Sequence, residues 1–214
     1  MRYFIVDNFY PDPHQARKFG LSLTFKPGYS EKDGVGSWNY PGRRCFNPWP
    51  SNQNYLKQRF QEITNEKIVD WKTNWTNTAY HIGYEEKYGI NWIHHDFSKW
   101  MNTKLNFWAA VIYLHPNPPP NTGTTLYKHK TRGFGGINGK GSGHFFGRLE
   151  DSDLLDKEDW IPHVTIENVF NRCIIYPGTV FHAPTISWFG NSKETGRLTQ
   201  IGFWSSLPRK QNEV

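Results

Sequence analysis

The chain has 214 residues, a length that suits one domain with a sizeable core, and its formal net charge is +6. This charge favours anionic ligands, but the chain lacks the polybasic run expected of a dedicated nucleic-acid binder. No apolar stretch approaches the ~18 residues of a transmembrane helix, and residues 1–25 carry no signal pattern. Two widely separated cysteines, Cys45 and Cys173, indicate free thiols, so we expect a cytoplasmic protein.

The first third of the chain predicts one strand and two helices. Residues 2–7 form a short β-favouring run, and a helix is expected directly after Asp12, which has the residue type of an N-cap and is followed by proline. Residues 26–50 are rich in glycine, proline and aromatic residues and are expected to be irregular. A second helix is expected from a Ser51 cap to about Ile63, because its apolar residues fall on one face.

Beyond the second helix the pattern changes to the alternation typical of strands. The run 106–114 is almost continuously apolar, which predicts a strand buried on both faces. Many short strands after early helices favour a mostly β fold, a sandwich or jelly roll with packed helices, over a parallel α/β fold. Strands are expected over 68–84 as one long or broken strand, around His94 and Asp96, and over 106–114, 123–129, 165–170, 172–176, 179–183 and 198–205.

The chain contains no internal repeat and no linker, so residues 1–214 are expected to form a single domain. Residues 1–67 would pack on a β core at 68–205, with a lid-like insertion at 128–164. Within it, residues 128–148 are rich in glycine and basic residues, which suits either a mobile lid or a solvated surface loop. The acidic residues at 150–159 suit a short surface helix.

Candidate metal ligands lie in the sequence Trp92-Ile-His-His-Asp96. His94 and Asp96 are two residues apart and therefore share one face of a strand. Imidazole and carboxylate are two of the three ligands of the facial triad that binds non-haem Fe(II). Two alternatives remain at this point: His95 could be the ligand, although it would face away from Asp96, or the pair could be purely structural.

Further polar residues follow in an order that suits one site. His182 comes after an apolar strand and a tight turn, so it could supply a third ligand from the returning strand. Arg197 and Thr199 are two apart at the start of the last strand, and a guanidinium group suits a carboxylate because it donates two parallel hydrogen bonds. Tyr113 ends the most apolar strand and could contact the same carboxylate.

The order His-x-Asp, distal His and then Arg on the last strand resembles the Fe(II)/2-oxoglutarate-dependent oxygenases. Further motifs resemble the prolyl 4-hydroxylase-like branch of that family. The resemblance covers roughly residues 68–205 and extends more weakly to the N-terminal third. Its motifs are Ala79–Gly83, Ile112–Leu114, Gly123–Leu126, Asn171–Gly178 and Phe203-Trp204.

This resemblance implies a double-stranded β-helix (jelly-roll) core that uses Fe(II), 2-oxoglutarate and O2. The activity would be hydroxylation of an unactivated C–H bond with release of succinate and CO2. The implied iron ligands are His94, Asp96 and His182. The distal carboxylate of 2-oxoglutarate would be held by Arg197, Tyr113 and Thr199, and Tyr80 would line the co-substrate pocket.

The substrate is the least determined part of this hypothesis. A peptidyl residue such as proline is the first expectation, a free amino acid or other small metabolite the second, and a non-catalytic jelly roll that binds a metal or ligand the third. The stretch between His182 and Arg197 is longer than prolyl hydroxylases usually show. Nucleic-acid demethylation is disfavoured, because Arg209 lies too far along to be that family's second arginine. Arg43 and Arg44 are interpreted as a solvated basic surface rather than as a site for an acidic peptide or 2-oxoglutarate.

Overall fold

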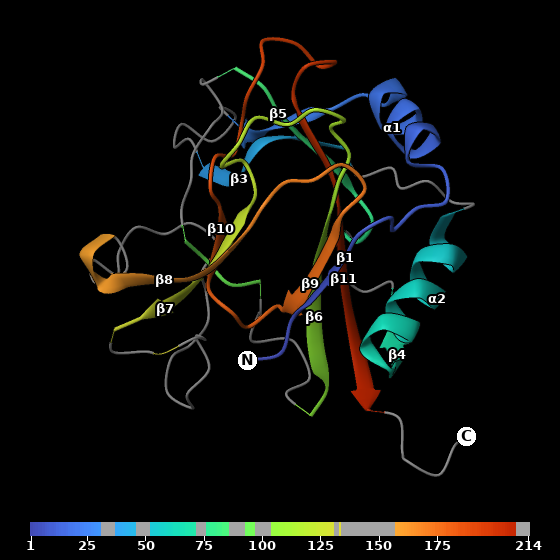
Figure 1. Ribbon diagram of the computed structural model, residues 1–214, viewed down its shortest axis with the longest axis vertical. Helices are drawn as coiled ribbons and strands as arrows, with labels where there is room; N and C mark the ends of the chain where they lie inside the picture. Colours follow the sequence, from blue (N-terminus) through green and yellow to red (C-terminus); the bar gives the residue numbers. More distant parts are fainter. Residues whose placement is uncertain are drawn as a thin grey trace.

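Two antiparallel β-sheets lie against each other in the computed structural model and enclose a shared interior (Figure 1). Apolar residues of both sheets meet in one buried cluster between them, which is the arrangement of a jelly roll. The prediction of a mostly β, double-stranded β-helix core with packed helices is confirmed. The structure describes residues 1–30, 37–45, 52–71, 76–85, 93–96, 104–130, 133 and 157–208.

The larger sheet, here called the major sheet, is built around its longest strand, β11. One edge of β11 pairs with β6, while its other edge pairs with β5 at the start and with β4 at the end. The sheet order is β1-β9-β6-β11-β5-β3-β2, with β4 beside β11. The strands are β1 (Phe4–Val6), β2 (Lys26–Ser30), β3 (Ser37–Cys45), β4 (Glu66–Asp70), β5 (Tyr80–Gly83), β6 (Asn106–Tyr113), β9 (Cys173–Pro177) and β11 (Arg197–Pro208).

The smaller sheet, here called the minor sheet, has β7 at its centre between β10 and β8. An isolated antiparallel bridge between His94 and His182 brings one further segment beside β10. The minor sheet therefore carries His182, and the bridge places His94 directly beside it. Its strands are β7 (Thr124–His129), β8 (Trp160–Ile166) and β10 (His182–Pro184), and a short 3-10 helix, η4 (Lys157–Asp159), precedes β8.

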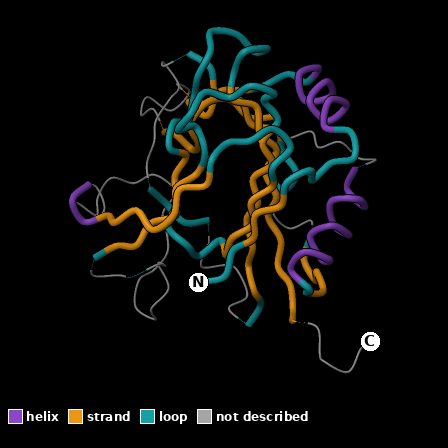
Figure 2. The backbone as a smooth tube through the Cα atoms, in the orientation of Figure 1, coloured by secondary structure: helices purple, strands orange, loops and turns teal. Residues whose placement is uncertain are grey.

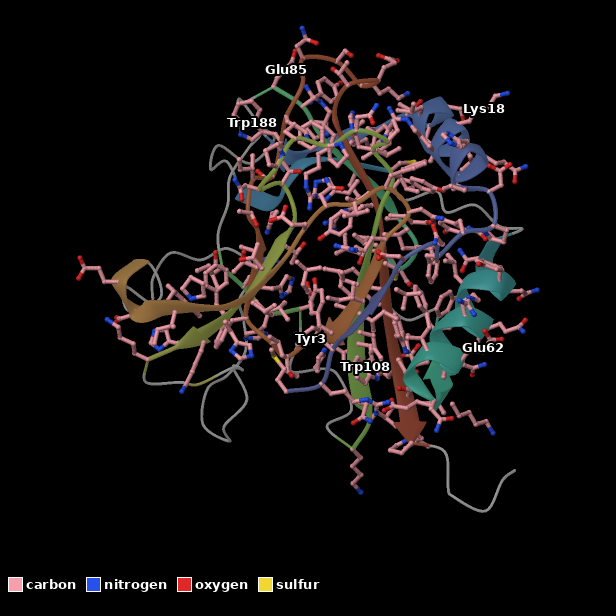
Figure 3. The ribbon with its side chains drawn as sticks, viewed as in Figure 1. Tyr3, Lys18, Glu62, Glu85, Trp108 and Trp188 are labelled. Carbon is pink, nitrogen blue, oxygen red and sulfur yellow. The ribbon has the colours of Figure 1, made fainter. Side chains whose placement is uncertain are left out.

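Both α-helices lie on one side of the major sheet, away from the interior (Figure 2). Helix α1 (Pro13–Ser22) begins as predicted, because the Asp12 carboxylate accepts a 2.9 Å hydrogen bond from the Gln15 backbone N–H. Helix α2 (Gln53–Thr64) has Asn52 at its N-cap without a side-chain hydrogen bond, and the predicted Ser51 cap lies outside the described residues. Figure 3 shows Lys18 and Glu62 on the sides of these helices that turn away from the sheet.

The strands of the major sheet alternate between two hydrophobic clusters. The outer face packs against the helices, and the inner face packs against the minor sheet, because successive side chains of a strand point to opposite sides. Phe60 of α2 and Trp204 of β11 stack on the outer face with ring centroids 4.3 Å apart. Buried outer-face side chains include Tyr80, Ile82, Ile112, Leu198 and Trp204, whereas Ala79, Tyr113, Ile174, Ile201 and Phe203 belong to the inner face.

Several predicted boundaries are corrected by the structure. Residues 26–50 contain β2 and β3 instead of irregular structure. The two strands pair with each other, and β3 also pairs with β5, a partner that lies far along the chain and leaves no sign in the local sequence. The expected strand 165–170 is shifted, since β8 ends at Ile166. The stretch 68–84, expected to be one long or broken strand, is broken into two strands, β4 and β5. His94 forms an isolated bridge rather than part of a longer strand.

Other predictions concern residues of which the structure describes only part. Residues 128–148, expected to be either a mobile lid or a solvated surface loop, lie mostly outside the described residues. The same holds for the acidic surface helix expected at 150–159, of which only η4 is described. Cys45 and Cys173 are both buried and free, as predicted. Within the described residues, no helix combines the length and the apolar character needed to cross a membrane.

Candidate metal centre

His94, Asp96 and His182 are brought together by backbone hydrogen bonds between two distant segments. The N–H groups of His94 and His182 each donate to the carbonyl of the other residue, at 3.0 and 2.7 Å. Asp96 is held by a third bond, from its N–H to the Gly178 carbonyl at 2.7 Å. The segment is thus fixed against β10 and against the turn before it, which determines where all three side chains lie.

The three side chains are close enough to share one metal ion. His94 Nε2 lies 3.7 Å from Asp96 Oδ1, and His182 Nε2 lies 3.3 Å from Asp96 Oδ2. The potential ligand atoms of all three residues fall within 4.8 Å of one another. Nitrogen and oxygen ligands bound at about 2.0–2.2 Å in neighbouring positions of one ion are roughly 3 Å apart. Small side-chain adjustments would therefore suffice for these residues to bind a metal.

The local chemistry fits a cation. His182 Nδ1 lies 2.9 Å from the Val180 carbonyl, which favours the tautomer that leaves Nε2 as an acceptor facing Asp96. Asp96 Oδ2 is buried and makes no hydrogen bond within the described part of the chain. Burial lowers the pKa of His182 to about 4 and raises the pKa of Asp96, while the nearby basic side chains of His94, Arg44 and His95 act on the pKa of Asp96 in the opposite direction. A divalent cation between neutral imidazoles and a carboxylate would offset this cost of burial.

His95, the alternative ligand, is placed elsewhere. Its buried ring packs against Phe181, with centroids 5.5 Å apart, next to Trp160. This group is separate from the three clustered side chains. The structure thus brings His94, and not His95, to Asp96 and His182.

Arg197 lies in the same interior and is 5% exposed. Its Nε donates to the Thr122 carbonyl at 2.9 Å and its Nη2 to the Gly123 carbonyl at 3.2 Å. No carboxylate among the described residues forms an ion pair with it. A buried charge without a counter-ion is costly, even though a guanidinium keeps its proton, so this group is suited to an anionic ligand.

Tyr113 and Thr199, the other two residues predicted to bind the co-substrate carboxylate, lie beside Arg197. The Arg197 guanidinium carbon is 5.5 Å from the centre of the Tyr113 ring, and Thr199 is directly opposite Tyr113 in the strand pairing. The Tyr113 hydroxyl donates to Thr124 Oγ1 at 2.8 Å. Burial raises the pKa of Tyr113 to about 12, so its hydroxyl is neutral. Thr124, from the minor sheet, was not among the predicted site residues.

Tyr80 is not brought into this group. Its hydroxyl donates to the Ala16 carbonyl at 3.2 Å, and its ring lies against Gly20 of α1 in the outer cluster. This placement corrects the expectation that Tyr80 lines the co-substrate site. The expectation is displaced by one position along β5, since the next residue, His81, is opposite Thr199 and faces the interior.

His81 and Tyr176 are two interior residues that sequence reasoning missed. The Tyr176 ring is buried 4.7 Å from the His182 ring, and burial raises the pKa of its hydroxyl, with Asp96 and Tyr113 acting in the same direction. Tyr176 therefore lies between the metal cluster and the arginine group. It is part of the apolar run of β9, so only the alternation that places it with Ile174 on the inner face could have indicated its position.

Comparison with known proteins places the chain in a family. A family model described as "Family of unknown function (DUF6445)" matches residues 2–204. The chain belongs to the DUF6445 family. Among curated proteins, none matches the chain by sequence.

Solved structures share the fold of this DUF6445 protein at low sequence identity. The α-ketoglutarate-dependent carbocyclase SnoK from nogalamycin biosynthesis is 9% identical, with a TM-score of 0.59 over 99% of this chain and 84% of that chain. HygX from Streptomyces hygroscopicus, with nickel, 2-oxoglutarate and hygromycin B bound, is 11% identical, with a TM-score of 0.54 over 95% and 82%. A Trichoplax adhaerens prolyl hydroxylase in complex with a peptide is 12% identical, with a TM-score of 0.52 over 95% and 83%. The jelly-roll fold of this DUF6445 protein is thus the fold of non-haem, 2-oxoglutarate-dependent enzymes.

Proposed function

We propose that this DUF6445 protein is an Fe(II)- and 2-oxoglutarate-dependent oxygenase. The observation that carries the proposal is a pairing inside one jelly roll: a His-Asp-His cluster shares the interior with a buried arginine that has no described counter-ion. When bound, Fe(II) with 2-oxoglutarate and O2 supplies oxidative decarboxylation to succinate and CO2, coupled to hydroxylation of an unactivated C–H bond.

The iron would be held by His94, Asp96 and His182. Three protein ligands on one side of an ion leave its other positions open to a chelating co-substrate. The Val180 carbonyl would orient His182 by accepting its Nδ1 proton, and the His94–His182 backbone pairing would keep the two imidazoles together.

The distal carboxylate of 2-oxoglutarate would be bound by Arg197. The Thr122 and Gly123 carbonyls hold its guanidinium in one orientation, which reduces the entropy lost on binding. Tyr113 and Thr199 would add hydroxyl contacts from neighbouring strands. Around them, buried residues such as Leu126 and Ile174 would exclude water from the site.

For the substrate, we propose a peptidyl residue such as proline first, supported by the similar fold of a prolyl hydroxylase that binds a peptide. A free amino acid or other small metabolite is the second candidate, because HygX, which has the same fold, holds hygromycin B. The two candidates can be distinguished by incubating the protein with iron, 2-oxoglutarate and proline peptides. Succinate formation and a mass increase of the peptide are the readouts. Turnover of free metabolites without any turnover of peptides would favour the second candidate.

Removal of one ligand tests the iron site itself. Asp96→Asn keeps the size of the side chain but removes its charge, so we expect Mn(II) and Fe(II) affinity to fall at least about a hundredfold and succinate formation to be lost. Calorimetric titration of metal and a succinate assay are the measurements, and Arg43→Gln, which alters a residue with partners on the outer face, is the control. Unchanged metal affinity in Asp96→Asn would contradict the assignment. Metal binding without succinate formation in the wild-type protein would favour a non-catalytic jelly roll.

A further inference from the structure

A row of four side chains crosses the inner face of the major sheet and ends at an arginine. Tyr113 of β6 is opposite Thr199 of β11, and Thr199 is opposite His81 of β5. On the far side of β5, His81 is opposite Arg44 of β3. Directly opposed residues in antiparallel strands project to the same side of a sheet. Since Tyr113 belongs to the inner cluster, Arg44 also faces the interior.

The neighbouring arginine, Arg43, faces the other way. Its Nη1 donates to the Tyr84 carbonyl at 3.0 Å, and its Nη2 forms a 2.9 Å ion pair with Glu85. Its guanidinium also lies 3.9 Å from the centre of the Tyr84 ring. The interpretation of Arg43 and Arg44 as a solvated basic surface is therefore corrected: the Arg43 side chain is only 14% exposed, and Arg44 is half-buried on the inner face.

Arg44 shares the inner face of the major sheet with a residue that contacts the metal centre. Tyr176 belongs to the inner cluster, and its ring centroid lies 4.7 Å from that of His182. Strand spacing separates Arg44 from the co-substrate arginine, because β3 and β11 are two strands apart, or roughly 10 Å. In Figure 1, β3 lies on the same side of the molecule as β10, which carries His182. The inner face thus has two arginine positions, on strands that are separated by β5.

The position of Arg44 is fixed by a close approach between β3 and β5. Gly42 has a φ of +74°, and a Cβ atom at that position would lie 2.6 Å from the Ile82 carbonyl oxygen and 3.0 Å from His81 Nε2. Any larger residue at position 42 would push the two strands apart. The glycine therefore holds the backbone of Arg44 in register with His81, as a binding group requires.

We propose that Arg44 binds a carboxylate group of the substrate, so that the substrate of this enzyme is a carboxylic acid or an acidic peptide. The inference rests on the proposed function. With Fe(II) and the 2-oxoglutarate dianion bound, the charges of Asp96, Arg197 and Arg44 leave a single excess positive charge among these groups. One carboxylate neutralises that charge, and a guanidinium binds a carboxylate through two parallel hydrogen bonds.

Matched pairs of small probes, in which an amide replaces a carboxylate, test this inference. We would titrate the Mn(II)- and 2-oxoglutarate-loaded protein with N-acetyl-L-proline and N-acetyl-L-prolinamide, and with benzoate and benzamide, following water-proton relaxation. The expected result is that the wild-type protein binds the carboxylates at least about tenfold more tightly than the amides. Arg44→Gln should remove this preference, Arg44→Lys should retain part of it, and Arg43→Gln should leave it unchanged.

The outcomes separate the two proposals. If the wild-type protein binds no 2-oxoglutarate, the proposed function fails. If 2-oxoglutarate binds to the wild-type protein but the carboxylate probes bind no more tightly than the amide probes, the role of Arg44 is overturned and the proposed function stands. The same conclusion holds if neither kind of probe binds. If Arg44→Gln weakens the binding of 2-oxoglutarate as much as it weakens the binding of the probes, Arg44 binds the co-substrate and the inference is also overturned. Thermal unfolding of each variant shows whether it is folded. If Arg44→Gln is not folded, Arg44→Lys is compared with the wild-type protein instead.

Discussion

The two faces of the major sheet differ in chemistry although the same strands form both. On β5, β6 and β11, an outer-face residue is followed directly by an inner-face residue: Tyr80 by His81, Ile112 by Tyr113, and Leu198 by Thr199. The outer members are packed against α1, α2 and their neighbours. The inner members form the row that joins the two arginines. Because side chains alternate along a strand, a residue that packs in the core and a residue that faces the proposed site are direct neighbours in the sequence.

Polar groups show the same difference. On the outer face, one buried network is satisfied: Asn52 donates to the Tyr10 hydroxyl at 2.9 Å, Tyr10 donates to Gln200, and Gln200 donates to the Thr78 carbonyl at 3.1 Å. On the inner face, Arg197 donates to the backbone carbonyls of Thr122 and Gly123, and Asp96 Oδ2 makes no hydrogen bond with any described residue. A satisfied buried network stabilises the fold, whereas unmet hydrogen-bonding capacity is available to a ligand. Outer-face changes should therefore alter stability, and inner-face changes should alter binding.

The largest effect is expected at the outer-face stack. Phe60 is fully buried against Trp204, so Phe60→Ala should lower the free energy of unfolding by about 3–5 kcal/mol. Urea unfolding monitored by tryptophan fluorescence measures this loss. The affinity of the folded variant for Mn(II) should remain that of the wild-type protein, because the stack lies across the sheet from the metal ligands. A large loss of metal affinity per folded molecule would show that the two faces are not independent.

Two tyrosines on opposite faces allow stability and co-substrate binding to be compared directly, with smaller expected effects than at Phe60. Tyr80→Phe removes the hydrogen bond to Ala16 and should cost about 0.5–1.5 kcal/mol of stability while the KM for 2-oxoglutarate stays unchanged. Tyr113→Phe should instead raise the KM for 2-oxoglutarate about three- to tenfold with little effect on stability, if its hydroxyl contacts the co-substrate. Paired unfolding and succinate assays on both variants measure the effects.

The same pair tests the correction to the sequence-based site. If Tyr80→Phe raised the KM and Tyr113→Phe did not, Tyr80 would be the co-substrate residue that the family resemblance implied. The assignment of the strand faces would then be wrong at β5.

The smallest effect is expected outside both faces, where Asp7 and Arg172 join β1 to β9 through two hydrogen bonds of 2.6 and 3.0 Å. The bond from Arg172 lowers the pKa of Asp7, so the pair stabilises the protein above the ordinary Asp pKa, and this contribution is lost as the pH falls through the lower folded value. The pair is partly exposed, so Asp7→Asn should cost only a few tenths of a kcal/mol, or about 1 at most, at pH 6. Unfolding curves from pH 6 to pH 3 should converge for the two proteins, while metal and 2-oxoglutarate binding at pH 7 stays equal.

Much of the fold and of the candidate site follows from local patterns. The Asp12 cap, the apolar stripe of α2 and the buried run of β6 depend on neighbouring residues, and the structure has these elements where the sequence predicts them. The spacing of His94 and Asp96 also fixes which histidine shares a side with the carboxylate, because alternation is a local property. In contrast, β2 and β3 were missed, because residues 26–50 are rich in glycine and proline, and β3 is joined to the rest of the sheet only by its pairing with β5, far along the chain.

The sequence by itself determined the mostly β class, most of the strands beyond the second helix, the His-x-Asp pair and the residue types suited to iron and a carboxylate. Only the tertiary structure decided that Tyr80 belongs to the outer face, that His81 and Arg44 join the interior, and that Arg197 is buried without a described counter-ion. The physical reason is strand register. A shift of one residue exchanges the faces of every side chain in a strand, and the register is set by pairing with strands far away in the sequence.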